Sequence, residues 1–454
     1  GVTFMNQHIH LIGIGGTGMG PLAKVFLEMG HSVSGSDLQP SDTTDYLAKL
    51  GAKIYFQHAA ANVNGATSVI YSSAIPVQNP EMVAARKNGL NVLHRSEVLA
   101  QLLNSKRGIA IGGAHGKTTI TSMLALCLEN AGLDPTVLIG AHFAPFGPGA
   151  KYGQGQFVVA EADESDGSFL RYRPEVTVVT SIEPDHLENY NGTFESLIDS
   201  YRRFLANCES AGLRLIGIDD PVAASMSREY ECETYGFSQH AHWRADVVNL
   251  DQQRSHFRVY RQGVFFGDFE LSVPGRHNVA NALACIAVAN YVGLSVAQMQ
   301  TALRMFSGAQ RRFQIIGTHN GALIVDDYAH HPTEVAATIK AAREGWPSRQ
   351  IVAVFQPHRY SRTKLLFDDF VRSFKEADVV IITDIYAPPP EQAIPGVSSS
   401  ILADRVRELK GPKKVYHIPK QEDVAPFLRG WLNDSDLVLV MGAGPIWRVA
   451  RDLV

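Results

Sequence analysis

The glycine-rich segment at 112–119, which reads Gly-Gly-Ala-His-Gly-Lys-Thr-Thr, has the residue types best suited to chemistry in this chain. Glycines in such a turn let backbone N–H groups approach phosphate oxygens, because no Cβ stands in the way. Lys117 could neutralise the β- and γ-phosphates, and the Thr118 hydroxyl could complete the shell of a Mg²⁺ ion. The match to the phosphate-loop pattern is partial, since Ile111 stands where that pattern has glycine. We predict ATP or GTP binding; the alternative, a turn that binds nothing, gives Lys117 no role.

A second glycine-rich segment at 13–18 reads Gly-Ile-Gly-Gly-Thr-Gly, follows a predicted strand over 8–14, and has Asp37 at the end of the next predicted strand. A pyrophosphate could lie on the following helix N-terminus while the carboxylate reaches a ribose. Taken alone, this fingerprint predicts an NAD(P) dehydrogenase, although any nucleoside diphosphate with a ribose would satisfy it. The separate triphosphate loop favours an enzyme that binds one nucleotide as a carrier and another as an energy source.

Acidic residues and a histidine follow two apolar strands that we predict near the phosphate loop. The strand over 157–161 ends at Glu161, where a carboxylate could bind Mg²⁺. Asp163 and Glu164 are then interpreted as ordinary loop acids. His186 follows another apolar strand and could bind a second metal or orient a phosphate, the alternative being a loop histidine without a ligand.

Two arginines, Arg359 and Arg362, follow an apolar strand in the last third of the chain. A guanidinium group binds carboxylate or phosphate through two parallel hydrogen bonds, so we predict anion recognition there. Alternatively, or in addition, Asp326 or Asp327 at a neighbouring strand end pairs with one of the arginines.

The adjacent pair His330 and His331 resembles a zinc motif only superficially. Adjacent residues at a helix start point in different directions, and the sequence offers no third ligand at close spacing. We therefore expect no zinc at this pair.

The composition narrows the class of protein. The 454 residues are enough for about three domains, and 41 basic residues against 45 acidic ones give a net charge of −4. The sequence has no basic block that would neutralise a nucleic-acid backbone, and no apolar run near the roughly 18 residues of a membrane span. Four single cysteines without a C-x-x-C motif are typical of a reducing compartment. We expect a cytoplasmic enzyme with neither nucleic-acid nor membrane partners.

Short apolar strands alternate with helical patterns, which predicts an α/β fold with parallel sheets. Polar stretches at 104–107 and 308–313 indicate domain boundaries, and the pattern near 241–271 predicts shorter, more polar strands. The proline-rich segment at 387–399 predicts an exposed loop.

Together these segments closely resemble the bacterial Mur ligases over nearly the whole chain, and in particular the branch of the family that adds alanine. The resemblance rests on the segments at 13–19, 72–75, 113–119, 161–166, 183–187, 275–281, 311–313, 326–334 and 355–362. It implies three domains: a Rossmann-like UDP-sugar-binding domain at 1–105, a central P-loop ATPase-type domain at 106–307, and a Rossmann-like C-terminal domain at 308–454. The last would bind the amino acid and close over the ATP.

The resemblance implies an ATP-dependent ligase of peptidoglycan precursor synthesis. It would join L-alanine to the lactyl carboxylate of UDP-N-acetylmuramate through an acyl phosphate, with two Mg²⁺ ions as cofactors. Three alternatives remain open from the sequence: a relative that adds a recycled tripeptide to the same sugar nucleotide, a nicotinamide oxidoreductase, and a nucleotide switch without enzymatic activity.

The resemblance also implies roles for individual residues. The residues at the ATP would be Gly113, Ala114, His115, Gly116, Lys117, Thr118, Thr119, Asn278, Asn281 and Arg312. The metal ligands would be Thr118, Glu161 and His186. The residues at the UDP-sugar would be Gly15, Gly16, Thr17, Gly18, Met19, Asp37, Ser73 and His94. The catalytic residues would be Lys117, His186, His330, Arg359 and Arg362.

The chain departs from the family pattern in three places. Ala114 and Ile120 replace two threonines of the family loop, which removes no phosphate donor used above. The segment at 201–205 has no lysine, whereas several sister ligases carry a carbamylated lysine there; this fits the alanine-adding branch. Three prolines at 388–390 replace a short Ala-Gly-Glu, so the sequence assigns no role to Glu391.

Overall fold

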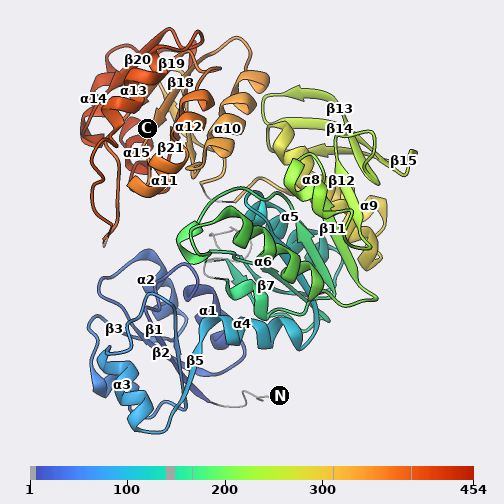
Figure 1. Ribbon diagram of the computed structural model, residues 1–454, viewed down its shortest axis with the longest axis vertical. Helices are drawn as coiled ribbons and strands as arrows, with labels where there is room; N and C mark the ends of the chain where they lie inside the picture. The colour runs from blue at the N-terminus through green and yellow to red at the C-terminus, as the bar shows by residue number, and fades with distance from the viewer. Residues whose placement is uncertain (1–6, 140–148, 166, 310, 390) are drawn as a thin grey trace. The chain divides into compact units, whose positions relative to one another are not determined.

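The computed structural model describes residues 7–139, 149–165, 167–309, 311–389 and 391–454, and Figure 1 shows the chain as a ribbon. The chain divides into two compact units. The first contains the residues up to Ala245 together with Val259–Gly267 and Asn281–Leu303, and the second contains the remainder. Each unit is built from α/β elements, as the alternation of strands and helices predicts. The α/β fold with parallel sheets expected from the sequence is therefore confirmed.

The first sheet has five parallel strands in the order β3-β2-β1-β4-β5. In chain order these are β1 (His8–Ile12), β2 (Ser32–Ser36), β3 (Lys53–Tyr55), β4 (Ser68–Tyr71) and β5 (Asn91–His94). Its helices are α1 (Gly20–Glu28), α2 (Asp42–Lys49), α3 (Pro80–Lys87) and α4 (Arg95–Asn104). Ile9 and Leu11 belong to one apolar core and Ile12 to another. The sheet therefore buries both faces, as expected for parallel strands.

The second sheet has ten strands in the order β15-β14-β13-β12-β11-β10-β6-β9-β7-β8. Its parallel part is formed by β6 (Arg107–Gly112), β7 (Thr136–Leu138), β9 (Phe157–Glu161), β10 (Val176–Val179), β11 (Leu213–Gly217) and β12 (Glu233–Gly236), with β8 (Ala150–Lys151) antiparallel to β7. The helices that follow in this part of the chain are α5 (Lys117–Asn130), α6 (Phe194–Ala206), α7 (Pro221–Met226), α8 (Arg276–Val292) and α9 (Val296–Met305).

The prediction of short polar strands near 241–271 is correct in polarity but wrong in length. The strands are β13 (Trp243–Asp251), β14 (Arg254–Arg261) and β15 (Val264–Leu271), which have nine, eight and eight residues. In β14, buried residues alternate with exposed or half-buried ones. A sheet with one solvated face has this alternation, and its polar residues make continuous strands look interrupted in the sequence.

Within the first unit, a single apolar core connects the first sheet to the second. It includes Leu11 and Leu103 from the first-sheet region, and Ala110, Val158 and Phe204 from the second-sheet region. A polar contact joins the same two regions, because the Lys24 ammonium donates a hydrogen bond to the Ala150 carbonyl. The two sheets of this unit therefore share their packing.

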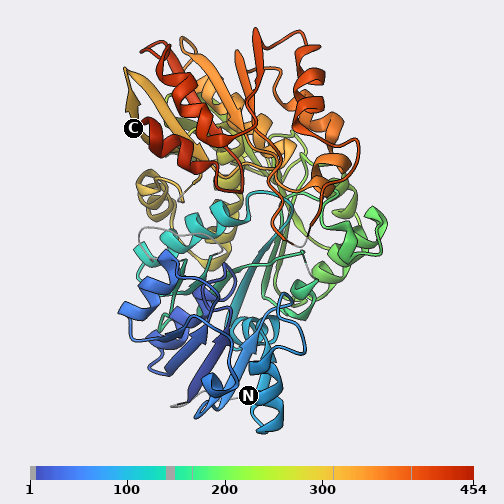
Figure 2. The same ribbon diagram turned by 90° about the vertical axis from the view of Figure 1, so that its left-hand side faces the viewer.

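The second unit contains a six-stranded sheet in the order β16-β17-β21-β18-β19-β20, parallel except for β16. The strands are β16 (Gln314–His319), β17 (Ala322–Asp327), β18 (Gln350–Phe355), β19 (Val379–Ile382), β20 (Lys414–His417) and β21 (Asp436–Met441). One face packs on the helices α10 (Pro332–Gly345), α12 (Phe367–Ser373) and α13 (Ser399–Arg407), and the other on α14 (Val424–Arg429) and α15 (Trp447–Leu453). Figure 2 gives a second view of these helices and the sheet between them.

Two further observations concern the apolar character of the helices and the positions of the cysteines. Among the described residues, no helix combines the length and apolar character needed to span a bilayer. Cys127 and Cys285 are buried and are free thiols. The structure also places their sulfur atoms 3.7 Å apart, a proximity that the sequence did not indicate.

Candidate functional site

The phosphate loop predicted from the sequence connects β6 to α5, and two of its glycines have no substitute. Gly113 and Gly116 have φ angles of 123° and 85°, in the region that side chains disfavour. A Cβ on Gly113 would lie 1.9 Å from the Thr180 hydroxyl oxygen, and one on Gly116 would lie 2.4 Å from the Asn281 amide oxygen. The loop therefore packs too closely for side chains, and α8 brings Asn281 to it.

Lys117, the first residue of α5, is held over this loop by two acceptors. Its ammonium donates to the Gly113 carbonyl at 2.9 Å and to the Glu164 carboxylate at 2.7 Å. Burial alone would lower the pKa of Lys117, but nearby carboxylates, chiefly that of Glu164, raise it above its usual value. The loop thus carries a fixed positive charge. The interpretation of Glu164 as an ordinary loop acid is wrong, because it is 6% exposed and pairs with this lysine.

Thr118 and Glu161, predicted as ligands of one metal ion, lie together. The Thr118 hydroxyl donates to the Glu161 carboxylate at 2.7 Å. The parallel register, which pairs Ile111 of β6 with Glu161 of β9, brings the carboxylate to the loop. Hydroxyl and carboxylate oxygens are the ligands that Mg²⁺ prefers, so this pair fits a magnesium ion.

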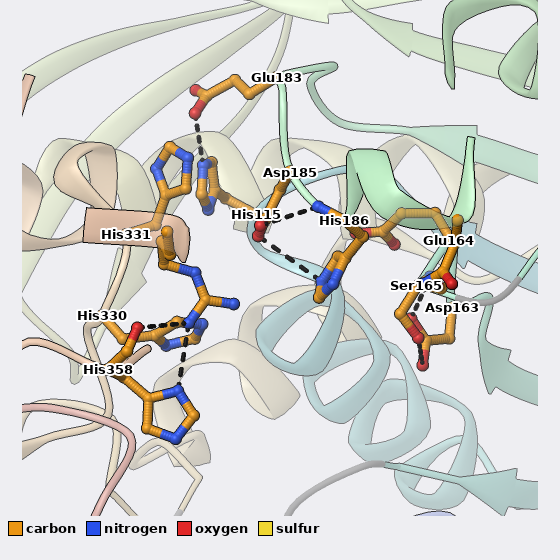
Figure 3. A network of polar contacts seen from close by, with 12 residues as sticks. His115, Asp163, Glu164, Ser165, Glu183, Asp185, His186, His330, His331 and His358 are labelled. Atoms are coloured by element: carbon orange, nitrogen blue, oxygen red, sulfur yellow. Dashed lines mark hydrogen bonds and ion pairs between the residues drawn. The ribbon is translucent and has the colours of Figure 1, made fainter. Parts of the chain in front are cut away.

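His186, the third predicted metal ligand, has a left-handed backbone with φ of 54°. Its Nε2 lies 3.6 Å from an Asp185 carboxylate oxygen. Burial raises the pKa of Glu164, and the nearby His186 partly opposes this rise. Figure 3 shows Asp185 and His186 near Asp163 and Glu164.

His115 of the loop is oriented by two contacts within the first unit. Its Nε2 lies 2.9 Å from the Glu183 carboxylate, and its carbonyl accepts a hydrogen bond from the Thr180 hydroxyl at 2.5 Å. Figure 3 shows the His115–Glu183 pair. These contacts connect the phosphate loop to the segment after β10.

The first-sheet glycine loop is built around Asp37. The Gly15 N–H donates to one Asp37 carboxylate oxygen at 2.9 Å, and the Leu38 N–H donates to the other at 2.8 Å. Gly16 and Thr17 are exposed at the tip of the loop. Met19, in contrast, is 3% exposed and packs in the apolar core, so its side chain does not face the loop surface.

Ser73 and His94, predicted to contact the same ligand as this loop, also lie together. The Ser73 hydroxyl is 2.9 Å from Nε2 of His94, and the opposite ring nitrogen is 2.6 Å from the Ser96 hydroxyl. The next residue, Arg95, lies beside the loop, because a Cβ on Gly18 would be 3.1 Å from its guanidinium group.

Arg95 connects the two loops of the first unit. Its guanidinium group lies 3.7 Å from the Asp163 carboxylate, two residues after Glu161. Partial desolvation would raise the pKa of Asp163, but the nearby cations, chiefly Lys117 and to a lesser extent Arg95, lower it. A residue that the sequence analysis did not single out therefore stands between the two glycine-rich segments.

In the second unit, Arg359 and Arg362 follow β18 and are held in different ways. Arg359 has a φ of 72°, which is rare for a side chain of this size and is typical of strained functional positions. Its N–H donates to the Tyr386 carbonyl at 2.8 Å. Arg362 is 7% exposed, and its Nη1 donates to the His358 carbonyl at 3.3 Å and lies 3.2 Å from Nδ1 of the same residue.

His330 lies near these arginines. Its Nδ1 is 3.0 Å from the Tyr328 carbonyl, and its ring centroid is 6.4 Å from that of His358. Burial, together with the nearby Arg362, lowers the pKa of both imidazoles to about 4. Both rings are therefore neutral at neutral pH.

The structure gives Asp326 and Asp327 partners other than Arg359 and Arg362. Asp326 pairs with Arg311, whose Nε lies 3.1 Å from its carboxylate. Asp327 accepts the Phe313 N–H at 2.8 Å and the Ala329 N–H at 2.7 Å, and burial raises the pKa of Asp327 to about 6. These carboxylates fix the segment that enters β16.

Two further predicted residues, and His331 of the adjacent histidine pair, lie in the second unit. Asn278, at the start of α8, donates to the Pro274 carbonyl at 2.9 Å and is 8% exposed. The Arg312 guanidinium lies 5.4 Å from the Tyr328 ring centroid. His331 caps the N-terminus of α10.

Glu391, to which the sequence assigned no role, contacts the arginine segment. Its carboxylate accepts the Ser361 N–H at 2.7 Å and lies 3.9 Å from the Arg359 guanidinium. The proline-rich segment therefore packs on this part of the second unit through a carboxylate.

Sequence reasoning missed Glu164, Arg95, His358 and Glu391. Two of them neighbour a predicted residue, since Arg95 follows His94 and His358 precedes Arg359. Adjacency was a signal for these two, whereas the partners of Glu164, Arg95 and Glu391 lie too far along the chain for any spacing to show.

Comparison with known proteins now adds to this geometry. Three family models match consecutive parts of the chain: the Mur ligase family catalytic domain at 8–107, the Mur ligase middle domain at 111–289, and the Mur ligase glutamate ligase domain at 311–444. The chain belongs to the Mur ligase family.

Individual relatives match this Mur ligase over its full length. It is 46% identical to the UDP-N-acetylmuramate–L-alanine ligase of Symbiobacterium thermophilum, with 98% of this chain and 94% of the relative covered. It is 45% identical to the enzyme of that name from Trichlorobacter lovleyi, with 99% and 98% covered. The crystal structure of the UDP-N-acetylmuramate–alanine ligase of Thermotoga maritima matches with a TM-score of 0.84 at 28% identity, with 99% and 98% covered.

Proposed function

We propose that this Mur ligase joins L-alanine to the lactyl carboxylate of UDP-N-acetylmuramate at the expense of ATP, in peptidoglycan precursor synthesis. The observation that carries the proposal is the full-length identity of 45–46% to relatives that share this one activity in their names. The separate charged and uncharged glycine loops support it, because the reaction needs two different nucleotides.

Domain roles follow from the loops. We assign UDP-sugar binding to residues 1–105, ATP binding to 106–307, and amino-acid binding to 308–454. The exposed tip at Gly16 and Thr17, and the Ser73–His94 pair, support the first assignment. The Lys117 ammonium, held over a loop in which Gly113 and Gly116 leave no room for a Cβ, supports the second.

The reaction must activate a carboxylate before an amine can attack it. The lactyl carboxylate attacks the γ-phosphate of ATP, which gives an acyl phosphate and ADP; the L-alanine amine then attacks the carbonyl, and phosphate leaves. Both steps bring negative groups together, so a charged Lys117 near the phosphates lowers the barrier. Arg95, between the two loops, is placed to offset charge from either side.

The metal requirement belongs to this proposal. Thr118 and Glu161 would hold one Mg²⁺, and Glu161 with His186 would hold a second. When bound, the ions would neutralise phosphate charge. The Thr118–Glu161 hydrogen bond of 2.7 Å places both oxygens within reach of a single ion.

The amino-acid site is assigned to the arginine segment of the second unit. Arg359 or Arg362 would bind the α-carboxylate of L-alanine through two hydrogen bonds. The neutral imidazoles of His330 and His358 would lie near the amine without repelling it.

The test is an acceptor comparison with purified protein, ATP and UDP-N-acetylmuramate. Phosphate release and the mass of the product are measured with L-alanine, L-serine, glycine and the tripeptide L-alanyl-γ-D-glutamyl-meso-diaminopimelate. L-Alanine is expected to be the best acceptor, with glycine and serine lower only moderately, because one methyl-sized difference is worth about 1–3 kcal/mol. Faster turnover with the tripeptide would overturn the proposal in favour of the tripeptide-adding alternative.

A further inference from the structure

A buried polar cluster lies within the first sheet, away from both loops' ligand-facing surfaces. His10 occupies the middle of β1 on the face that packs against α3, and Glu81 is in the first turn of α3; both are 0% exposed. The Glu81 carboxylate bonds His10 through one oxygen and His58 through the other, the latter at 2.9 Å. An apolar pair would fill this space without the cost of desolvating a carboxylate.

The cluster continues to the end of β2 through two serines. Nδ1 of His58 is 3.0 Å from the Ser36 hydroxyl, and Nδ1 of His10 is 2.8 Å from the Ser34 hydroxyl. The hydrogen bonds from His10, His58 and Ser36 outweigh burial and lower the pKa of Glu81 below its usual range. Glu81 is therefore a carboxylate at neutral pH and accepts hydrogen bonds from two other elements.

Ser36 is also the residue on which the glycine loop rests. Its carbonyl accepts the Gly13 N–H at 2.7 Å and the Ile14 N–H at 3.0 Å. The next residue, Asp37, accepts the Gly15 N–H at 2.9 Å. The side chain of Ser36 thus belongs to the buried cluster, and its backbone belongs to the loop.

We propose that Glu81 is a positioning residue of the UDP-sugar site, acting through His58 and Ser36 to fix the end of β2 and hence the backbone N–H groups of the loop at 13–18. The inference rests on the proposed function, because it takes a UDP-sugar as the ligand of this loop. A loop that contributes no cationic side chain depends on the exact direction of its backbone donors. The residues that pack beneath the loop and fix these directions therefore determine its affinity for the ligand.

The experiment measures binding of UDP and of UDP-N-acetylmuramate by calorimetry, and steady-state kinetics, for Glu81→Gln and Ser36→Ala. Glu81→Gln keeps the shape but removes the charge, and is expected to weaken binding of both ligands about tenfold, the effect of one hydrogen bond to a charged group. The KM for the sugar nucleotide rises by the same factor, while the KM for ATP and kcat stay within twofold. Ser36→Ala removes only the link to the loop and is expected to reproduce the loss in part.

Glu175→Gln is the matched control. Glu175 is another paired carboxylate of the first unit, half-buried where Glu81 is fully buried, and bonded to Arg107 at 2.9 Å and 2.7 Å at the opposite end of β6 from the phosphate loop. Thermal stability is measured for every variant. If Glu81→Gln lowers the melting temperature but binds UDP as Glu175→Gln does, the cluster is only structural and the inference is wrong.

Two further outcomes are distinguishable. If Glu81→Gln does not fold, Ser36→Ala decides: unchanged UDP affinity in that variant overturns the inference. If the wild-type protein itself binds neither UDP nor UDP-N-acetylmuramate, the assignment of the first domain in the proposed function fails, and the inference falls with it.

Discussion

The two glycine-rich loops of the first unit have similar sequence patterns but different sources of charge. The loop at 112–119 carries its own cation, Lys117, which is held by a buried carboxylate. The loop at 13–18 contributes no cationic side chain of its own; its nearest titratable partner, Asp37, is an acceptor for its backbone. The difference teaches that glycine spacing indicates a phosphate, whereas the charged neighbours indicate which chemistry follows. In our proposal, the loop with Lys117 would take part in phosphoryl transfer, and the loop at 13–18 would bind the carrier nucleotide.

The variant with the largest expected effect removes the cation of the charged loop, Lys117. Lys117→Ala is expected to reduce turnover by about 10²–10³-fold, or about 3–4 kcal/mol, because a charge contact made in the transition state is lost. Binding of UDP-N-acetylmuramate should remain within twofold of the wild type. Phosphate release and calorimetry measure the two effects.

Lys106→Ala is the control for that variant. Lys106 precedes β6 and donates hydrogen bonds to the Gly153 and Gly155 carbonyls, neither of which belongs to the loop at 112–119. Turnover of Lys117→Ala within tenfold of the wild type would contradict the assignment of this loop to the reacting ATP.

The next test concerns the carboxylates of the charged loop. Glu161→Gln is expected to lower activity about 10–100-fold and to be partly rescued by excess Mg²⁺ or Mn²⁺, because the variant retains an oxygen ligand but loses charge. Glu164→Gln should lose activity without rescue, since Glu164 acts on Lys117. Metal titrations of both variants and of His186→Ala measure the difference. An unchanged metal requirement in Glu161→Gln and His186→Ala would remove both from the metal site.

The arginine segment of the second unit, which we propose as a third anion site, extends the comparison from charge to geometry. Arg359→Lys and Arg362→Lys keep the charge but lose the planar pair of donors. At least one of them is expected to raise the KM for L-alanine about tenfold or more, with kcat changed less. Kinetics at saturating ATP and sugar nucleotide check this. If L-alanine dependence is unaltered in both, the acceptor is bound elsewhere.

The smallest expected effect belongs to the uncharged loop. Asp37→Asn retains one acceptor for the Gly15 N–H and should raise the KM for UDP-N-acetylmuramate by a few fold, or about 1 kcal/mol, with no change in the KM for ATP. Varying each substrate in turn separates the two. A change confined to the KM for ATP would reverse the roles given to the two loops.

Much of this arrangement was predictable from local patterns. The apolar strand before each loop, and the carboxylate at the end of β9, follow from short-range sequence, since parallel strands bring their carboxyl ends to one edge. The pairing of Lys117 with Glu164 was not predictable, because it joins residues 47 positions apart. No periodicity specifies the register that places them together.

The buried cluster around Glu81 shows the same limit more strongly. His10 alternates with apolar residues in β1, a pattern typical of a solvent-facing position, and only the packing of α3 on that face reveals its burial and its carboxylate partner. Polar residues within an apolar strand are therefore the places where sequence reasoning most needs the tertiary structure.

The apolar core shared by the two sheets of the first unit has a consequence for folding. Because Leu103 and Phe204 pack in the same core as Leu11, neither sheet can lose its structure without exposing the apolar surface of the other. The first unit is then expected to unfold cooperatively on heating. A fragment cut at the boundary near residue 105 would expose apolar surface to water. The two glycine-rich loops of this enzyme are therefore attached to one shared apolar core.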